Sequence, residues 1–316
     1  MGTFYHYVFH QQMLGMIEEA SRKHNNTLNL SRYEITSLPE MLLKLKDLTK
    51  LYLNNNKLEN LPDEFTILQG LQTLALDYNK LTQLPSNLCA LKELVCLNLS
   101  YNPLKTLNSE IGELKKLEVL WLNCTQLESL PPDIGKLKNI DTLGARGNQL
   151  RELPTEIGQL SRLRWLTLEN NQITSIPDSF TSLQNLIHLN LKKNRLDKIP
   201  APLAQIKTLQ FCFLAQNNIS EISEIEVEQL QHIKKLDIRE NPLPSNEWFK
   251  NFPNLLVGKD DVVAPDPTSD SESEDWEDSV PTSEIDLSES SEDDHEDNDI
   301  AVMSLPEVSR FALSGC

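Results

Sequence analysis

A step of 23 residues runs through most of this 316-residue chain and restricts its fold more than any other feature. The pattern LxxLxLxxNxL recurs, with an asparagine or a substitute for it at constant intervals. These positions are Asn56, Asn79, Asn102, Thr125, Asn148, Asn171, Asn194 and Asn217, followed by Asn241 after a step of 24. A fixed period of roughly 20 to 50 residues indicates a solenoid, in which each repeat forms one turn.

The leucine spacing inside each repeat predicts a short β-strand. The pair LxL has a period of two, so both leucines point to the interior and the residue between them points to the opposite face. Such pairs include Leu51 and Leu53, Leu74 and Leu76, and Leu97 and Leu99. Stacked repeats would join these strands into one parallel sheet. A further apolar column that includes Leu68, Leu91 and Leu114 predicts short helical or 3₁₀ turns on the convex side.

The recurring asparagine is a polar side chain at an interior position. Such a group is tolerated only when it is hydrogen-bonded, so we expect its amide to bind backbone groups of its own and adjacent turns. Thr125 can fill part of this role with its hydroxyl, whereas Tyr33 lies where a terminal repeat is expected to be irregular. A Leu-Pro or Ile-Pro step ends the strand side of most repeats, because proline cannot continue a hydrogen-bonded ladder. Asn108 and Ser223 interrupt that series.

The two ends of the stack need cover, because no repeat buries its apolar faces alone. Residues 1–26 are predicted to form an N-terminal helical cap, with Met13 and Ile17 on the apolar side of an amphipathic helix. About ten repeats are expected over 27–245, and an aromatic cluster in 246–257 is expected to cap the other end. The predicted fold is an α/β solenoid, a horseshoe with a concave parallel β-sheet.

Residues 258–316 differ sharply from the rest in charge. They contain 19 acidic and 2 basic residues, a net charge of −17 out of −18 for the chain, which leaves −1 for the rest. Because the segment has few apolar residues to bury, it cannot offset the conformational entropy that folding would cost. We therefore expect a disordered acidic tail. It is either a solubilising or a regulatory segment. Serines with an acidic residue three positions on resemble acidophilic kinase sites, and these phosphorylation candidates are Ser269, Ser271, Ser283, Ser290 and Ser291.

Charge and motifs argue against several classes of function. A near-neutral body with an acidic tail lacks the basic surface that nucleic acids require. No segment reaches 18 uninterrupted apolar residues, so membrane insertion is not expected. The five cysteines show no CxxC spacing, which predicts reduced thiols and a cytoplasmic or nuclear location. Without a phosphate-binding loop, a kinase motif set or a catalytic triad, a non-catalytic protein that needs no cofactor or metal is expected.

Repeats such as LTKLYLNNNKLENLPDEFTILQG resemble the 23-residue intracellular class of leucine-rich repeats. The Leu-Pro step followed by I-G-x-L at Ile111, Ile134 and Ile157 resembles the Ras-suppressor, Erbin-like and plant Ras-group subset of that class. The resemblance implies a scaffold or adaptor in intracellular signalling, with a Ras-type GTPase or a protein phosphatase as partner. An alternative, by analogy with leucine-rich-repeat proteins that carry acidic tails, is a nuclear protein that binds histones or other basic proteins.

The outward positions of the concave sheet are the expected binding surface, because the repeated positions are already committed to packing. Exposed aromatic and arginine side chains are frequent interface hot spots. We therefore predict a protein-binding groove anchored by aromatic residues, with basic residues meeting acidic groups of the partner. Its candidates are Tyr52, Tyr78, Tyr101, Trp121, Arg146, Arg164, Trp165, His188, Lys192, Lys193, Phe211 and Phe213. The alternative role for the aromatic residues is to pair across strands and stabilise the sheet.

Overall fold

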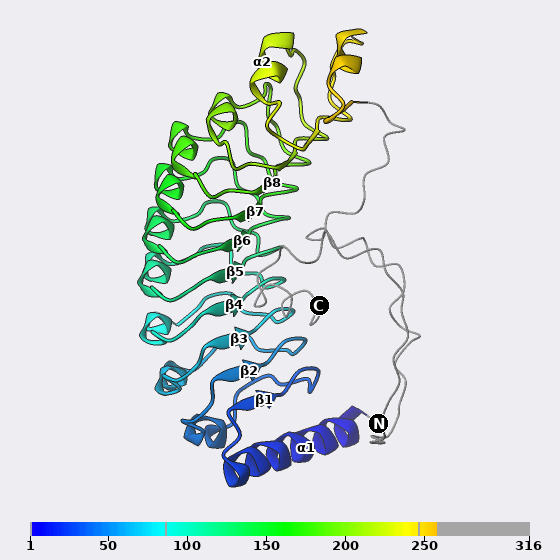
Figure 1. The fold of residues 1–316 in the computed structure, drawn as a ribbon. Coiled ribbons are helices and arrows are strands. Elements are labelled where there is room, and N and C mark those ends of the chain that lie inside the picture. The colour runs from blue at the N-terminus through cyan, green and yellow to red at the C-terminus, as the bar shows by residue number, and fades with distance from the viewer. Residues whose placement is uncertain (1, 86, 246, 258–316) are drawn as a thin grey trace, which may run out of the picture. The chain divides into compact units, whose positions relative to one another are not determined.

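The computed structural model describes residues 2–85, 87–245 and 247–257. The expected acidic tail, 258–316, with its five candidate serines, lies outside the described residues. Helix α1 (Gly2–Lys23) is followed by one parallel sheet of eleven strands, which are hydrogen-bonded in chain order (Figure 1). The predicted solenoid with a parallel sheet is therefore confirmed.

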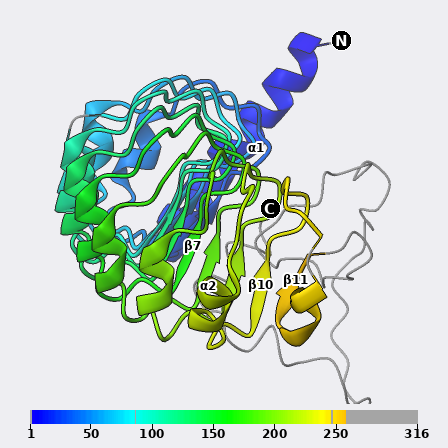
Figure 2. The ribbon, with the colours of Figure 1, turned by 90° about the horizontal axis from the view of Figure 1, so that it is seen from above.

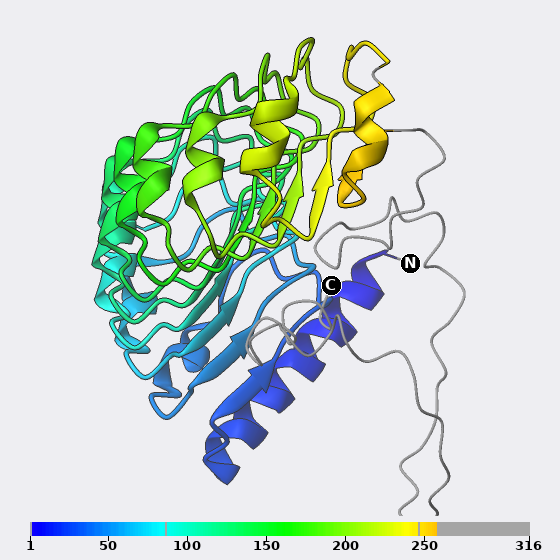
Figure 3. The same ribbon diagram turned by 45° about the horizontal axis from the view of Figure 1, so that its top comes forward.

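Each strand is three residues long except the last. The strands are β1 (Thr27–Asn29), β2 (Lys50–Tyr52), β3 (Thr73–Ala75), β4 (Cys96–Asn98), β5 (Val119–Trp121), β6 (Thr142–Gly144), β7 (Trp165–Thr167), β8 (His188–Asn190), β9 (Phe211–Phe213), β10 (Lys235–Asp237) and β11 (Leu255–Leu256). Leu51 pairs with Leu74, and Leu74 with Leu97, so the register follows the 23-residue step. Equivalent positions of successive turns are therefore aligned in columns across the sheet, whose stacked strands Figure 3 shows.

Short 3₁₀ turns form the convex side, as the apolar spacing predicted (Figures 1 and 2). They are η1 (Glu40–Lys44), η2 (Asp63–Ile67), η3 (Leu88–Ala90), η4 (Ser109–Glu113), η5 (Pro132–Lys136), η6 (Thr155–Gln159), η7 (Asp178–Ser182), η8 (Ala201–Gln205) and η9 (Glu247–Asn251). Pro131 precedes η5 with φ −67° and ψ 146°, and Asn108 takes nearly the same angles before η4, −65° and 147°. Most turns therefore start from one extended residue, whether or not it is proline.

Ser223, the second interruption of the proline series, starts an α-helix instead. Its hydroxyl accepts a hydrogen bond from the Glu226 backbone N–H at 3.3 Å, and the Glu226 carboxylate accepts one from the Ser223 N–H at 2.8 Å. This reciprocal pair is a capping box, which satisfies N–H groups at the start of a helix. Helix α2 (Glu224–Gln229) therefore replaces the 3₁₀ turn of this repeat.

The interior combines leucine columns with an asparagine ladder. Leu53, Leu76 and their equivalents are fully buried. The Asn79 amide donates to Leu53 O at 2.9 Å and to Leu76 O at 3.0 Å, and its oxygen accepts from Leu58 N at 3.0 Å. Each asparagine thus ties its turn to the one before it, as predicted. The Thr125 hydroxyl donates to Leu122 O at 2.8 Å and to Asn148 Oδ1 at 3.0 Å.

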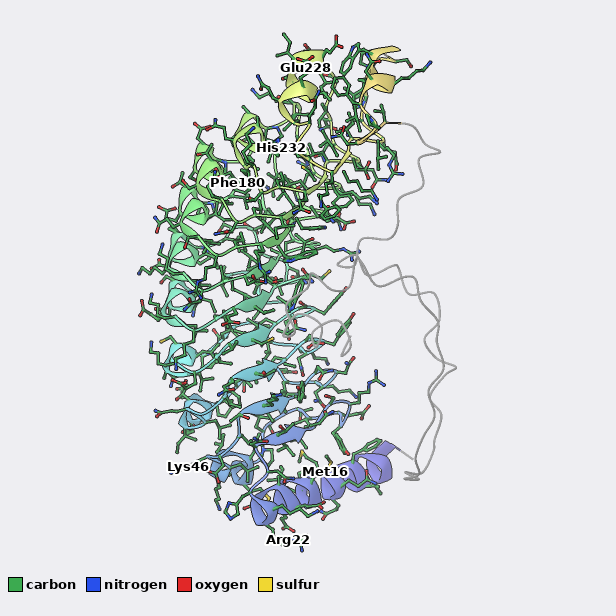
Figure 4. All side chains as sticks on the ribbon, viewed as in Figure 1. Met16, Arg22, Lys46, Phe180, Glu228 and His232 are labelled. Carbon is green, nitrogen blue, oxygen red and sulfur yellow. The ribbon has the colours of Figure 1, made fainter. Side chains whose placement is uncertain are left out.

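Both ends of the stack are covered. Met13 and Ile17 of α1 are buried against the first repeat, Met16 lies on the side of the helix that faces the repeats, and Arg22 lies on the opposite side (Figure 4). At the other end the Trp248 ring lies 5.8 Å, centroid to centroid, from that of Phe252. Strand β11 also extends the sheet there, which the leucine pattern did not predict.

Candidate functional site: the concave sheet face

Three columns of side chains line the concave face. The first and third residue of each strand, and the residue two positions further on, point away from the buried leucines. The leading column is Thr27, Lys50, Thr73, Cys96, Val119, Thr142, Trp165, His188, Phe211 and Lys235. The central column is Asn29, Tyr52, Ala75, Asn98, Trp121, Gly144, Thr167, Asn190, Phe213 and Asp237. The trailing column is Ser31, Asn54, Asp77, Ser100, Asn123, Arg146, Glu169, Lys192, Ala215 and Arg239.

The aromatic residues in the C-terminal half of the face pack on one another. The Trp165 ring stacks on the His188 ring with centroids 4.8 Å apart, and the Phe213 ring lies 5.2 Å from that of His188. The exposed fractions of these residues and of Trp121 lie between 2% and 7%. The expectation that Trp121 and Trp165 are exposed anchors is therefore wrong, and the candidates His188 and Phe213 are buried as well. These four side chains make contacts between neighbouring strands that stabilise the sheet. Phe211, the remaining aromatic candidate in this half of the face, is half-exposed.

Trp121 lies over Gly144 of the neighbouring strand. A Cβ atom added at Gly144 would stand 2.2 Å from Trp121 Cε3, so glycine leaves the space that the indole occupies. The two residues are partners in the β5–β6 register. A glycine placed one 23-residue step after a tryptophan was a signal in the sequence for this packing, and sequence reasoning missed it.

The aromatic residues of the N-terminal half remain accessible. Tyr78 is 41% exposed, and its ring stacks on that of Tyr101 with centroids 4.1 Å apart and planes at 10°. Tyr52 is half-buried on β2. The backbone at Tyr78 and Tyr101 has φ of 51° and 55°, the left-handed region that bulky side chains rarely adopt. The same position has a positive φ in the other repeats, among them Cys124 and Lys193 with φ of 53° and 56°, so this conformation belongs to the repeat. What distinguishes the tyrosine pair is the exposed, stacked arrangement of its rings.

Two of the predicted basic contacts are already occupied within the chain. Arg146 Nε lies 3.9 Å from Glu169 Oε2, and Arg164 forms an ion pair with Asp141. In both cases the acid stands one 23-residue step away, so the pairing follows from the register. Lys192 is half-buried and Lys193 is exposed, and the described part of the chain gives neither lysine an ion-pair partner.

Asp77 is a site residue that sequence reasoning missed. It is 2% exposed, and its Oδ2 atom has no hydrogen-bond partner among the described residues. Burial raises the pKa of this carboxyl to about 7. Burial, and then the nearby Asp77, raise the pKa of the Cys96 thiol to about 12. The signal in the sequence was a charged residue at a repeat position that holds Asn54 and Ser100 in the adjacent repeats.

Replacing Asp77 by asparagine should stabilise the chain at alkaline pH. Folding raises the pKa of the Asp77 carboxyl from 3.8 to about 7, so the free energy of unfolding falls as pH rises from about 4 to about 7 and stays at the lower value above that. The asparagine amide is itself left without a full set of hydrogen bonds, which offsets part of the gain. Asp77→Asn should therefore raise the free energy of unfolding by about 2 kcal/mol at about pH 8.5.

Thermal unfolding of both chains at about pH 4 and at about pH 8.5 checks this prediction. The advantage of Asp77→Asn should vanish at the lower pH, and an equal advantage at both would contradict it. Burial also raises the pKa of Tyr52, and that of Cys96 is near 12, so neither neighbour changes charge in this range.

The described residues offer little for catalysis. They contain no group of three or more side chains that could hold a metal ion. Burial, and then the charge of Asp77 or Asp237, raise the pKa of the Cys96 and Cys212 thiols, whereas nucleophilic cysteines have lowered pKa values. No described helix has the length and apolar character needed to cross a membrane.

Two family models and several solved structures match the chain. Residues 142–258 match the model described as a leucine-rich repeat region, and residues 46–104 match the leucine rich repeat model. A leucine-rich-repeat protein of Leptospira interrogans is similar, with 32% identity over 76% of this chain and 74% of that chain and a TM-score of 0.59. No curated protein matches the sequence.

Two plant receptors are similar over part of their length. One is the ectodomain of the Arabidopsis thaliana receptor kinase GASSHO1/SCHENGEN3 in complex with Casparian strip integrity factor 2, with 29% identity over 73% of this chain and 29% of that chain, and a TM-score of 0.63. The other is the plant peptide hormone receptor RGFR1 in complex with RGF2, with 31% identity over 71% of this chain and 38% of that chain, and a TM-score of 0.59. With the repeats, the asparagine ladder and the Leptospira protein, these findings show that the chain belongs to the leucine-rich-repeat family.

Proposed function

We propose that this chain is a non-catalytic scaffold or adaptor that holds a protein partner on its concave sheet face. The observation that carries this proposal is the stacked, accessible pair Tyr78 and Tyr101. Each follows the trailing column of the concave face by one residue, at the repeat position that Lys193 also occupies beside Lys192. Accessible aromatic side chains are typical interface anchors. The plant receptors that share the fold are bound to their factors, which supports a binding role for this fold.

The finer proposal is an adaptor in intracellular signalling, cytoplasmic or also nuclear, whose partner is a Ras-type GTPase or a protein phosphatase. The I-G-x-L segments at Ile111, Ile134 and Ile157, and their resemblance to the Ras-suppressor subset, support it. The second candidate is a nuclear protein that binds histones or other basic proteins. The net charge of −17 on 258–316 favours that candidate.

Changing the tyrosine pair should weaken partner capture without unfolding the repeats. Asparagine suits the left-handed backbone at this position and stands there in other repeats, as Asn55 and Asn170 with φ of 56° and 54°. The double variant Tyr78→Asn/Tyr101→Asn should therefore keep its melting temperature. We expect it to lower affinity for the partner at least about tenfold, because hot-spot aromatics contribute about 2 kcal/mol or more each.

The matched control is Ile67→Asn, which alters a convex side chain of similar exposure, 46% against 41% for Tyr78. Proteins captured by wild type, by this control and by the double variant should be compared by quantitative mass spectrometry. A GTPase or phosphatase lost only with the tyrosines supports the adaptor. Histones that remain bound to the double variant favour the second candidate, and equal losses from both variants contradict the concave site.

A further inference from the structure

The trailing column carries five charged residues, of which three are neutralised within the chain. Arg146 pairs with Glu169, and the Arg239 guanidinium donates to both Asp237 carboxylate oxygens at 2.8 Å. The other two, Asp77 and Lys192, have no ion-pair partner among the described residues. One column of the sheet therefore holds an uncompensated acid near β3 and an uncompensated base next to β8.

The register fixes the distance between these two charges. Asp77 and Lys192 occupy the same position of their repeats and stand 115 residues, or five steps of 23, apart. Neighbouring strands lie about 4.8 Å apart, so five steps across the sheet span about 24 Å. An extended polypeptide advances roughly 3.3 Å per residue, and it covers that span with about seven residues.

The surroundings of each charge suit opposite ends of one ligand. Asp77 is an acceptor with an unused carboxylate oxygen, and the Tyr78–Tyr101 stack begins at the next residue. Aromatic faces attract lysine and arginine side chains, and a buried carboxylate binds them with strong, charge-assisted hydrogen bonds. Lys192, with the exposed Lys193 beside it, can meet a carboxylate.

From this arrangement we infer that the concave face binds an extended segment of the protein partner. A lysine or arginine of that segment contacts Asp77, and an aspartate or glutamate about seven residues further along contacts Lys192. The inference rests on the proposed function and adds which charged residues the bound segment carries and in which direction it runs. The basic end lies toward α1 and the acidic end toward α2. Asp77 is enclosed in the free chain, so the side chains around it change rotamer when the segment binds, as is common at interfaces.

Two capped peptides of about eight residues and identical composition test this inference on the full chain. The first has lysine at one end and aspartate at the other, with neutral residues between them, and the second has lysine and aspartate adjacent in the middle. Identical composition cancels the general attraction of lysine to the acidic residues of 258–316. Fluorescence anisotropy should show that wild type binds the first peptide about tenfold more tightly, the effect of one well-placed charge pair.

Asp77→Asn and Lys192→Met should each abolish that preference, whereas Lys80→Met, at an exposed position outside the column, should keep it. Equal binding of the two peptides by wild type, or a preference that survives Asp77→Asn, would overturn the inference. The tyrosine experiment above separates the two proposals. If the peptides bind equally while the tyrosine variant still loses the partner, the inferred charge pattern of the bound segment is wrong and the concave binding site stands.

Discussion

Replacement of Asn148 by alanine is expected to lower the free energy of unfolding by roughly 4 kcal/mol. The Asn148 amide donates to Leu122 O, Ala145 O and Arg146 O at 2.8, 3.0 and 3.2 Å. Its oxygen accepts from Thr125 N at 2.9 Å, and from Leu127 N and Thr125 Oγ1 at 3.0 Å. Alanine leaves the buried N–H groups of Thr125 and Leu127 without an acceptor, each at a cost of about 1 to 3 kcal/mol. The carbonyls of Leu122, Ala145 and Arg146 lose one donor but keep Thr125 Oγ1, Asn171 Nδ2 and Cys124 N.

Urea denaturation followed by circular dichroism measures this loss. Gln149→Ala is the matched control, because Gln149 is the adjacent residue and its side chain is exposed. The control should change stability by less than about 0.5 kcal/mol. If both variants lose stability equally, the ladder is not what holds these turns together.

Replacement of Gly135 by alanine is expected to lower the free energy of unfolding by about 3 kcal/mol. A Cβ atom there would stand 2.5 Å from Glu156 O and 2.8 Å from Glu156 Cβ, so η5 and η6 would have to move apart. Backbone atoms of a stacked turn cannot rotate out of the way as a flexible side chain can.

Gly15→Ala is the control for this glycine substitution. Gly15 lies within α1, and nothing stands within 4 Å of a Cβ built on it. Since alanine is the better helix former by about 1 kcal/mol, this change should raise the melting temperature. The two substitutions are thus expected to have opposite signs, and a thermal melt in which both stabilise the chain would contradict the close stacking of η5 on η6.

The sequence predicted the fold well because one period controls strand, core and ladder together. Leu53, Leu76 and Asn79 recur at fixed offsets, and each has a structural role that its chemistry alone identifies. Strand β11 was missed because a two-residue strand in a capping segment has no repeat period to reveal it.

The binding face was harder to predict, because exposure depends on neighbours one repeat away. Trp165 points to the concave side as expected, yet it is buried because His188 follows it in the same column. Arg164 was expected to meet a partner, and it meets Asp141 instead. Asp77 was missed because the lack of a cation beside it cannot be seen from the sequence of one repeat.

A photo-crosslinker placed at single positions of the full chain tests most directly whether the concave face holds the partner. Benzoylphenylalanine should be introduced either at Tyr78, directly after the trailing column of the concave face, or at Ile67 in η2 on the convex side, two positions of similar exposure. After irradiation with the captured partner, covalent adducts are expected from position 78 and not from position 67. Adducts from position 67 with none from position 78 would contradict the account.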